Sequence, residues 1–372
     1  MLFVTALAFA AGLYVALSIG LTVVAARLPF RVWEPTKPLP RAAVLVAARN
    51  EEAHLPRCLD ALLAQDYPAD RLTIVVADDH STDGTAAVVE RYRERLGAAA
   101  GDRLRCVHVP DPEGHLTGKA LALHTALGAC DADLLLLTDA DCTPPPGWAR
   151  HLAAAFDDAH VGLVCGPTWV THRTALHRLQ GLDWAFLLAH ASLLAAIGRP
   201  LTAMGNNMAF RRAAYEAVGG YPALPFSVTE DYLLFRAVAE RTSYRVLLPL
   251  DPAFDNATEP LDRLSEVYAQ RRRWARGGLR APPWAFGLYA LTYFAHALPL
   301  IGLLLAPGPA LLALAAKLGA DAALLWTVLG RFGRRGLLRA FVLFEVYLFF
   351  YIVTLPAALL AAPRIRWKAR RL

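Results

Sequence analysis

Two carboxylates follow a run of four leucines near the middle of the chain. The run Leu134–Leu137 predicts a strand buried on both faces, and Asp139 and Asp141 come shortly after it. Open α/β sheets bind ligands at the carboxyl ends of their strands, and alternate residues of an extended chain point the same way. Both carboxylates can therefore face one spot, where two hard oxygen donors suit Mg²⁺ or Mn²⁺ and the phosphates that such an ion binds. A strand followed by an ordinary acidic turn before Pro144 explains the same residues without any chemistry.

A second acidic pair, Asp78 and Asp79, follows another apolar stretch, Leu72–Ala77, and precedes a predicted helix that reaches about Leu96. Strand, acidic tight turn and helix form the first half of a nucleotide-binding α/β unit, in which a carboxylate at the strand end accepts hydrogen bonds from a base or ribose. The stretch has no Gly-x-Gly-x-x-Gly pattern, which disfavours a dinucleotide cofactor. We expect Asp83 to cap the helix.

Polar residues also stand where two other helices are predicted to begin. We expect Asn50 to be the N-cap of a helix that reaches about Gln65, with Glu51 in its first turn. A well-capped helix explains that pair without a function. Lys119 opens a later helix and could meet a phosphate there, although a solvated lysine is the simpler explanation.

Two acids and a basic helix mark the end of this region. Glu230 and Asp231 follow Thr229, a predicted N-cap. These two acids either take part in catalysis or only stabilise the positive end of the helix dipole. In the basic stretch that comes later, helical spacing gathers three side chains on one face: Gln270, Arg273 and Trp274. A basic helix just before a membrane segment can also be a simple cytoplasmic anchor.

The elements that position these residues form one α/β domain. From Ala42 to Asp139 apolar strands alternate with amphipathic helices, which predicts a mostly parallel sheet. The acidic residues at the ends of its strands then share one edge. The nearly apolar segment 175–197 predicts either a core helix or a helix that lies in the membrane interface.

The composition indicates a membrane protein. Of the 372 residues, 56% are hydrophobic, more than is usual for a soluble enzyme of this length. The five cysteines are odd in number and form no Cys-x-x-Cys pair, so we expect reduced thiols and neither a disulfide framework nor a zinc site. The positive charge gathers at 271–276 and 364–371. It favours lipid headgroups or a pyrophosphate as partners, and no nucleic-acid-binding motif accompanies it.

Apolar segments at both ends of the chain predict membrane helices. The uncharged stretch Leu2–Ala26 precedes several basic residues, so we expect 1–27 to be a retained anchor with the following chain in the cytoplasm. The segment 284–363 holds three more candidate spans, and a basic tail, 364–372, follows it. The protein is therefore expected to be a multi-pass protein of the cytoplasmic (inner) membrane.

Basic segments flank the C-terminal candidate spans. The loop 331–339 and the tail are both basic, and they would fall on opposite sides if all three candidates crossed the membrane. We therefore expect one candidate to lie in the membrane interface or to re-enter the membrane, with the tail in the cytoplasm.

Lys317 and Asp321 are spaced i and i+4 inside the second candidate, and we expect them to pair.

Taken together, these motifs resemble the membrane-bound family 2 glycosyltransferases, which have a GT-A nucleotide-sugar-binding fold. The resemblance covers about residues 42–276 and implies a cytoplasmic catalytic domain over 42–280, flanked by transmembrane helices. Six motifs carry it in the family's order: Asn50-Glu51, Asp78-Asp79, Gly118-Lys119, Asp139-Ala140-Asp141, Thr229-Glu230-Asp231 and Gln270-x-x-Arg273-Trp274. Each is weak alone, and the six together are specific. The tail also looks like that of lipid-directed members such as ceramide glucosyltransferases.

The resemblance assigns a role to each matching residue. Asp79 would hydrogen-bond the nucleotide base with Glu51 beside it. Asp139 and Asp141 would hold the ribose and the metal-bridged diphosphate, with Mg²⁺ or Mn²⁺ as the cofactor. Asp231 matches the general base. Lys119 would bind the nucleotide-sugar, and Glu230 would support the general base. The motif that contains Gln270, Arg273 and Trp274 would close over the pyrophosphate and border the acceptor site.

One position departs from the family pattern. Arg49 stands where many members have an aromatic residue, which leaves base stacking there open. The implied activity is a metal-dependent, inverting transfer of one hexose from a nucleotide-sugar to a lipid-like acceptor, with a UDP-sugar such as UDP-glucose as the expected donor. A processive polysaccharide synthase also carries Gln-x-x-Arg-Trp and is the alternative enzyme. A silent scaffold with this fold is the alternative outside enzymes.

Overall fold

The computed structural model describes residues 1–97, 103–361, 366–367 and 370–371. The chain forms two compact units. The sheet unit comprises residues 30–169 and 202–259, and the helical unit comprises 1–29, 170–201 and 260–372. The segment 42–280, expected to be one domain, contributes to both units. The expected basic tail, 364–372, lies mostly outside the described residues. Its described residues form two short strands, β10 (Arg366–Trp367) and β11 (Arg370–Arg371), which pair with each other.

A seven-stranded sheet forms the centre of the sheet unit, and it is mostly parallel, as the sequence predicts. Its strands, in spatial order, are β3 (Leu104–His108), β2 (Leu72–Asp78), β1 (Ala42–Ala48), β4 (Leu134–Asp139), β7 (Asn207–Arg211), β5 (Val161–Cys165) and β8 (Arg245–Leu247). The first four are parallel, and β7 runs antiparallel to both of its neighbours. A separate two-stranded sheet pairs β6 (Thr168–Val170) with β9 (Asn256–Thr258).

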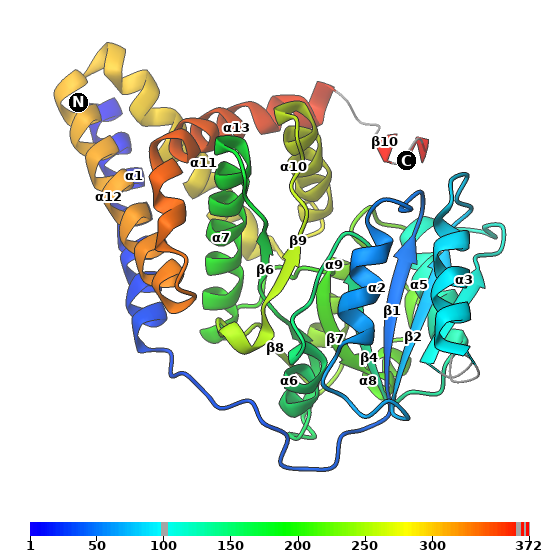
Figure 1. The fold of residues 1–372 in the computed structure, drawn as a ribbon. Helices are drawn as coiled ribbons and strands as arrows, with labels where there is room; N and C mark the ends of the chain where they lie inside the picture. Colours follow the sequence, from blue (N-terminus) through cyan, green and yellow to red (C-terminus); the bar gives the residue numbers. More distant parts are fainter. Residues whose placement is uncertain (98–102, 362–365, 368–369, 372) are drawn as a thin grey trace. The chain divides into compact units, whose positions relative to one another are not determined.

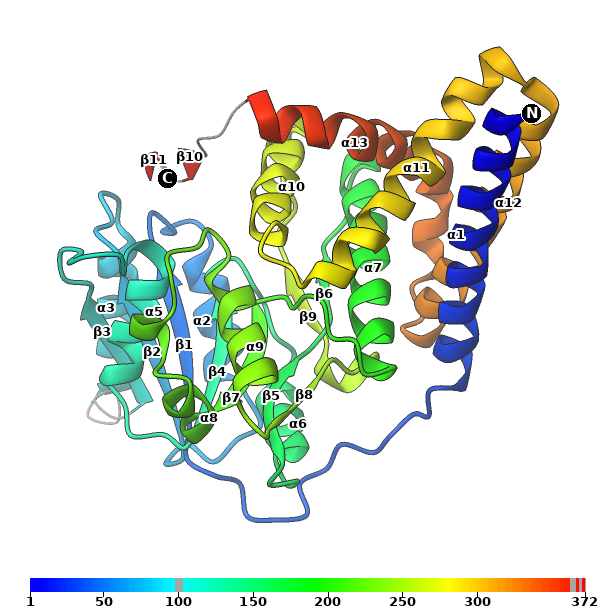
Figure 2. The ribbon, with the colours of Figure 1, turned by 180° about the vertical axis from the view of Figure 1, so that it is seen from behind.

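Helices cover both faces of this sheet. One face carries α2 (Leu55–Leu63), α3 (Thr85–Leu96) and α6 (Trp148–Ala155), which lie in front of the sheet in Figure 1. The view from behind shows α5 (Gly118–Gly128), α8 (Arg212–Ala217) and α9 (Glu230–Arg241) on the other face (Figure 2). The strands are buried from both sides, which explains why they read as continuous apolar runs.

The core of the sheet unit lies under α2, α3 and α6. Val44 and Val46 of β1 share one cluster with Leu59 of α2, Val89 of α3 and Trp148 of α6, and all five side chains are fully buried. Burying one aliphatic side chain of this size contributes about 1.5–3 kcal/mol. This packing holds the strands whose ends carry the acidic residues.

The prediction that Asn50 caps a helix is wrong. Helix α2 begins at Leu55 with His54 at the N-cap position and Pro56 in its first turn. Asn50 has a left-handed backbone with φ 54°, and its Oδ1 accepts the backbone N–H of Thr82 at 2.8 Å. Asparagine tolerates this conformation, so the side chain ties two loops together instead of starting a helix.

Helix caps were also predicted at Asp83 and Thr229. Asp83 accepts the N–H of Thr85, the first residue of α3, at 3.0 Å, but the N-cap of α3 is Gly84, so the predicted cap lies one residue before the actual one. Thr229 does stand at the N-cap position of α9, but its side chain makes no capping hydrogen bond. The short 3₁₀ helices of the sheet unit are η2 (Tyr221–Ala223) and η3 (Pro252–Phe254).

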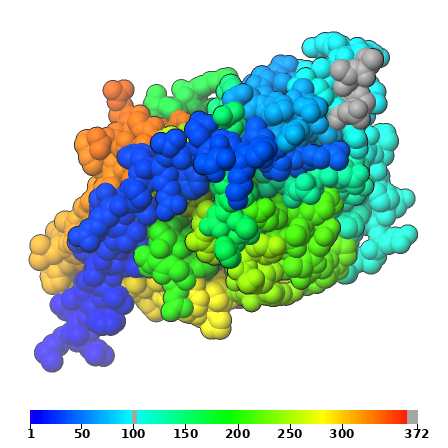
Figure 3. All heavy atoms as spheres, turned by 90° about the horizontal axis from the view of Figure 1, so that it is seen from below, coloured from blue at the N-terminus to red at the C-terminus, as the bar shows by residue number. Residues whose placement is uncertain are grey.

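The proline-rich segment 30–41 is packed against the sheet unit. Trp33 meets the ring of Phe254 edge-on at 4.7 Å, and Thr36 donates its N–H to the Asp157 carboxylate at 2.6 Å. Figure 3 shows this segment as a dark blue band on the molecular surface. The segment is therefore a fixed part of this unit.

The helical unit contains the predicted membrane segments. Its elements are α1 (Leu2–Arg27), α7 (Ala175–Ala196), α10 (Leu264–Gly278), α11 (Pro283–Leu305), α12 (Pro307–Arg331), η4 (Arg335–Ala340) and α13 (Phe341–Ala361). Within the described residues, five helical segments are long and apolar enough to cross a membrane: Leu2–Arg27, Ala175–Ala196, Pro283–Leu305, Pro307–Arg331 and Arg335–Ala361. Helix α7 is the most buried of these five.

A polar cluster is buried among these apolar helices. Lys317 of α12 pairs with Asp321 at 3.0 Å, as the sequence predicts, and also with Glu345 of α13. Tyr14 of α1 donates its hydroxyl hydrogen to Asp321 at 2.9 Å. All four side chains are nearly inaccessible to solvent. The cluster therefore links three helices, and the Tyr14 and Glu345 contacts join residues far apart in the sequence.

Candidate functional site

The carboxyl edge of the parallel strands gathers most of the predicted site residues. Strand β1 lies between β2 and β4 in parallel register, so the residues at the ends of all three strands meet at one edge. Arg49 follows β1, Asp79 follows β2, and Asp139 is the last residue of β4. This is the edge at which open α/β sheets bind their ligands.

Lys119 joins three elements at this edge. Its Nζ lies 2.5 Å from Oδ1 of Asp139 and 3.7 Å from Oε1 of Glu230, the first residue of α9. Burial alone would lower the pKa of Lys119, but the carboxylates of Asp139, Glu230 and Asp231 outweigh burial and raise it above its ordinary value. Lys119 therefore stays charged, and carboxylates outnumber cations around it.

Asp231 is held in one orientation by the backbone. Its Oδ2 accepts the N–H of Gly205 at 2.8 Å, and its Oδ1 accepts the N–H of Tyr232. A Cβ on residue 205 would overlap the Asp231 carboxylate, so only glycine permits this close approach. The backbone turn at 205–207 is itself fixed by Asn207, whose side-chain amide donates to the carbonyl oxygens of Pro167 and Phe254.

The residues at the end of β4 suit a divalent ion that arrives with a diphosphate. Among the described residues, no cluster of three or more His, Cys, Asp or Glu side chains could hold a metal alone. Mg²⁺ and Mn²⁺ need only one or two protein carboxylates when substrate phosphates complete the shell. Asp139 and Asp141 are suited to this role, and the local excess of negative charge favours a cation.

Two cysteines near these carboxylates stay protonated. Burial, followed by the charges of Asp141 and Asp139, raises the pKa of the Cys58 thiol, and the same causes raise that of Cys142. A neutral thiol is a poor ligand for Mg²⁺ or Mn²⁺. The carboxylates are therefore the groups in this part of the sheet that suit such an ion.

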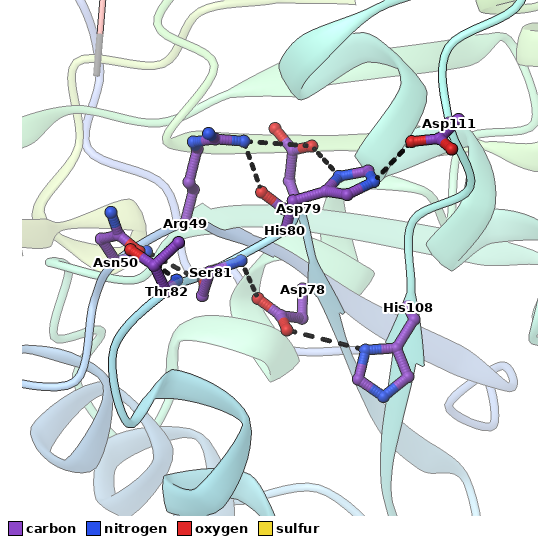
Figure 4. A network of polar contacts seen from close by, with 9 residues as sticks. All are labelled: Arg49, Asn50, Asp78, Asp79, His80, Ser81, Thr82, His108 and Asp111. Atoms are coloured by element: carbon purple, nitrogen blue, oxygen red, sulfur yellow. Dashed lines mark hydrogen bonds and ion pairs between the residues drawn. The ribbon is translucent and has the colours of Figure 1, made fainter. Parts of the chain in front are cut away.

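A polar network surrounds Asp79 (Figure 4). Arg49 Nη1 donates to the carbonyl oxygen of Asp79 at 2.8 Å and lies 3.8 Å from its carboxylate. The His80 ring lies between two carboxylates, 3.2 Å from Asp79 and 3.2 Å from Asp111. Arg49 thus lies directly beside Asp79, at the position where an aromatic residue is common in the resembled family.

The two loops at this network each contain a residue with a left-handed backbone. Within the described chain, Asn50 and His80 are the non-glycine residues with positive φ, at 54° and 57°. Asparagine and histidine adopt this conformation more readily than most residues do. Glu51, in the first of these loops, pairs with His54 at 2.9 Å and donates its N–H to Thr85. The loops are thus held in this conformation by their mutual contacts.

Three predicted residues belong to the helical unit instead: Gln270, Arg273 and Trp274, all partly buried on α10. The Trp274 ring meets Trp184 of α7 edge-on at 5.1 Å. Between these predicted residues, Arg271 is buried and pairs with Asp183 of α7 at 2.5 Å, with its guanidinium 4.0 Å from the Trp274 ring centre. The Gln-x-x-Arg-Trp motif is thus anchored to α7 through a buried ion pair.

With this geometry in place, comparison with known proteins is decisive for the family. The sequence profile described as "Glycosyltransferase like family 2" matches residues 40–277. The chain belongs to glycosyltransferase family 2. The match covers more than half of the chain and contains all six motifs found in the sequence.

Curated relatives of this glycosyltransferase share about a quarter to a third of its residues. The probable glycosyltransferase YdaM of Bacillus subtilis is 29% identical over 252 residues, which are 66% of this chain and 56% of that protein. The beta-monoglucosyldiacylglycerol synthase of Synechocystis sp. is 27% identical over 246 residues, 65% of this chain and 49% of that protein. The chain spans about half the length of these relatives.

A solved structure supports the fold of this glycosyltransferase. The mannosyltransferase PcManGT from Pyrobaculum calidifontis, solved with GDP-Man and Mn²⁺, superposes with a TM-score of 0.61. The two are 24% identical, and the match covers 95% of this chain and 99% of that one. The likeness confirms the predicted α/β, GT-A type of fold with flanking apolar helices.

Two residues, one in each unit, were not predicted from the sequence. Asp183 lies in a nearly apolar helix, where a lone buried carboxylate needs a cationic partner. The sequence therefore contained a sign that Asp183 pairs with a residue such as Arg271. Tyr221 lines a pocket beside Glu230 in the sheet unit. No pattern in the sequence singles out this tyrosine, because its neighbours come from other segments.

Proposed function

We propose that this glycosyltransferase moves one sugar from a nucleotide-sugar to the hydroxyl of a lipid-like acceptor by a single inverting displacement. One observation carries the proposal. The Lys119 ammonium contacts Asp139 at the metal-binding end of the site and Glu230, the neighbour of the oriented Asp231, at the other. Groups suited to a diphosphate and a group suited to a hydroxyl proton therefore lie on one edge of one sheet.

The donor phosphates would be bound beside Asp139 and Asp141, which would hold Mg²⁺ or Mn²⁺. When bound, the ion supplies positive charge that neutralises the leaving diphosphate. Lys119 adds a second fixed positive charge at the same place. Without a cation, the carboxylates would repel a diphosphate that must lie next to them.

Asp231 would act as the general base. The acceptor oxygen forms a bond to the anomeric carbon while the bond from that carbon to the diphosphate oxygen breaks, and the hydroxyl proton passes to Asp231. The N–H of Gly205 holds this carboxylate in one orientation, which proton transfer from a bound hydroxyl requires. One displacement inverts the anomeric centre, so an α-linked donor would give a β-linked product.

The nucleotide base would lie against Asp79 and Glu51. The Asp79 carboxylate suits an N–H donor on the edge of a base such as uracil. Arg49 stands beside it, and a planar guanidinium can stack on a base where an aromatic ring is absent. We propose a UDP-sugar such as UDP-glucose as the donor, with a hexose transferred.

A lipid-like acceptor is supported by the helical unit. Its apolar helices suit a protein that works at a membrane, which we propose is the cytoplasmic face of the inner membrane. Gln270, Arg273 and Trp274 would close over the pyrophosphate and border the acceptor. The Synechocystis relative carries the name of a diacylglycerol-glycolipid synthase, which fits the same class of acceptor.

The Gln-x-x-Arg-Trp motif also favours a processive polysaccharide synthase as the second candidate. A translocated polysaccharide needs a polar lining, because unsatisfied polar groups in lipid cost several kcal/mol each. Among the described residues of the membrane helices, Lys317, Asp321 and Glu345 are buried and bound to one another. They offer nothing to a sugar chain, so single transfer is the better supported function.

The test is a donor and acceptor screen in membranes. The enzyme is incubated with labelled UDP- and GDP-sugars and a lipid extract, with Mn²⁺ or with excess chelator, and the products are separated by chromatography. We expect organic-soluble products with one sugar each, formed only in the presence of metal. A ladder of long water-soluble chains would contradict single transfer, and full activity in chelator would contradict the metal assignment.

A further inference from the structure

Three polar side chains are buried along one side of α7, a largely apolar helix of the helical unit. They are His177, Gln180 and Asp183, each three residues from the next, so that consecutive members are neighbours on the helix surface. Removing a polar group from water is unfavourable unless the group finds a partner. The partners of these side chains therefore show what this side of α7 binds.

The first two side chains bind the chain segment that leads into α10. Gln180 accepts the backbone N–H of Leu261 at 3.0 Å and donates its amide to the carbonyl oxygen of the same residue at 2.8 Å. The His177 ring lies 3.1 Å from the carboxylate of Asp262. The approach to α10 is therefore held against α7, and the two helices lie side by side (Figure 1).

Asp183, the third of these side chains, makes its contact inside α10. Its Oδ2 accepts the Nε–H of Arg271 at 2.5 Å, and the two residues are only 5% and 3% exposed. Arg271 also contacts two residues of the Gln-x-x-Arg-Trp motif. Its guanidinium carbon lies 4.0 Å from the ring centre of Trp274, and its Nη1 lies 3.5 Å from Oε1 of Gln270. Asp183 is therefore connected to the motif through Arg271.

Apolar packing already holds α7 and α10 together one turn before this ion pair. Leu179 of α7 and Val267 of α10 share a buried cluster with Tyr347 of α13. Leu179 precedes Asp183 by four positions, and Val267 precedes Arg271 by four, so each apolar residue lies on the same side of its helix as the charged one. The two helices therefore have an apolar contact that does not depend on the ion pair.

Orientation is the contribution that an ion pair makes and apolar packing does not. Both charges of a buried pair lose their hydration, and hydrophobic side chains of the same volume often stabilise a protein equally well. A guanidinium, however, donates along fixed directions in its plane and attracts the face of an aromatic ring. Because Asp183 binds Arg271 on one side, Arg271 presents a fixed surface to Trp274 on the other.

We propose that Asp183 is a positioning residue for the transfer reaction. It fixes Arg271, and Arg271 fixes the Trp274 ring and the Gln270 amide. The proposal rests on the proposed function, in which these two motif side chains border the acceptor. It adds a residue outside the motif, on α7, that sets the orientation of the motif.

Fluorine NMR on Asp183→Asn tests the positioning without depending on turnover. The variant keeps the size of the side chain but removes the charge that holds Arg271. The eight tryptophans of the full chain in detergent are replaced by 5-fluorotryptophan, and the Trp274 resonance is assigned from its absence in Trp274→Phe. We expect this resonance to shift and broaden in Asp183→Asn, because the ring is no longer held in one orientation.

Transfer kinetics give the second readout. Labelled UDP-glucose is the donor, and a membrane lipid extract in mixed micelles supplies the acceptor. In Asp183→Asn, kcat/KM for the lipid should fall about 10- to 100-fold, mainly through a higher KM, since a misplacement of about 1 Å has an effect of this size. Partial unfolding lowers only the amount of active enzyme and leaves KM unchanged. Free UDP, titrated in the presence of Mn²⁺, should bind to the variant as it does to the wild type.

A double variant separates positioning from stability, and it decides the question if Asp183→Asn does not fold. Asp183→Leu combined with Arg271→Met replaces the ion pair with apolar side chains and should reach at least the wild-type melting temperature. It should still show the raised KM and the displaced Trp274 resonance, because no charge orients the ring. Glu345→Gln is the matched control. Glu345 belongs to another buried ion pair of the helical unit, with Lys317, and its replacement should change neither readout.

The outcomes distinguish this proposal from the proposed function. An unchanged KM in Asp183→Asn overturns the role in the reaction, whether or not the Trp274 resonance moves. A wild-type KM in the double variant also overturns it and leaves the ion pair a purely structural part. A wild type that neither binds UDP nor transfers sugar contradicts the proposed function, and the Trp274 resonance still decides whether Asp183 holds the motif.

Discussion

The Lys119 ammonium lies 2.5 Å from the Asp139 carboxylate, and this contact links the start of α5 to the carboxyl end of β4. The same ammonium reaches Glu230 on α9, so one cation is shared by carboxylates from two other elements. In the proposed function, this arrangement would keep a positive charge where the diphosphate leaves. It also offsets part of the repulsion between the acidic residues themselves.

Replacing Lys119 with methionine should weaken donor binding. The variant keeps the length and packing of the side chain but leaves Asp139 and Glu230 without their shared cation. We expect nucleotide-sugar affinity to fall about 10- to 100-fold, the range for a hydrogen bond to a charged group. Lys37→Met is the matched control, because Lys37 lies in the segment 30–41 and donates to a carbonyl oxygen of Asp157. An unchanged affinity in Lys119→Met would remove Lys119 from the binding site.

Gly205→Ala should reduce turnover with little effect on donor affinity. The added Cβ overlaps the Asp231 carboxylate and displaces it from the position that the Gly205 N–H defines. A displacement of about 1 Å can reduce the rate about 10²-fold. Gly128→Ala serves as the control, because a Cβ there meets nothing within 4 Å. Steady-state kinetics with normal kcat in Gly205→Ala would show that Asp231 does not need this orientation.

Lys317→Met should destabilise the helical unit. The substitution leaves Asp321 and Glu345 buried without their cation, a loss that typically costs 3–5 kcal/mol. Unfolding in detergent measures the free energy of unfolding. The triple variant Lys317→Met, Asp321→Asn, Glu345→Gln removes all three charges and should regain part of the loss. Equal stability of the single variant and the wild type would mean that the cluster contributes little.

Stability of the sheet unit should fall as the pH drops below about 6.5. Burial lowers the pKa of His124 from its ordinary value of 6.5, and its Nδ1 lies 3.0 Å from the Tyr215 hydroxyl. Because the unfolded chain then takes up a proton before the folded one does, this contribution is complete above pH 6.5. It is lost as the pH falls towards the folded pKa, by at most about 1.4 kcal/mol per pH unit.

His124→Gln isolates this contribution from the other titrating groups. Its free energy of unfolding should decline less steeply than that of the wild type between pH 6.5 and 5. His172→Gln, at an exposed position, should leave the slope as it is. Identical slopes for wild type and His124→Gln would show that the histidine is not held neutral in the folded state.

The strands and the acidic motifs could be predicted because their signals are local. The leucine run ending at Asp139 and the apolar stretch before Asp78 are buried on both faces, and each shows its role in its own sequence. The pairing of Lys317 with Asp321 followed from helical spacing for the same reason.

The remaining features depend on residues distant in the sequence. Asn50 looks like a helix cap, but the loop that carries Thr82 offers it a better partner. Tyr221 lines a pocket whose other wall lies before α5, about a hundred residues earlier in the chain. Asp183 and Arg271 pair across two helices. Such contacts arise only once the sheet and helices have packed.

Single-turnover transfer by Asp231→Asn tests the central claim most directly. The variant keeps the shape of the side chain and should bind the nucleotide-sugar nearly as well as the wild type. It should transfer the sugar about 10²- to 10⁴-fold more slowly, because the acceptor hydroxyl has lost its general base. Near-normal transfer by this variant would contradict the account and move the role of the base to another residue, with Glu230 the first to examine.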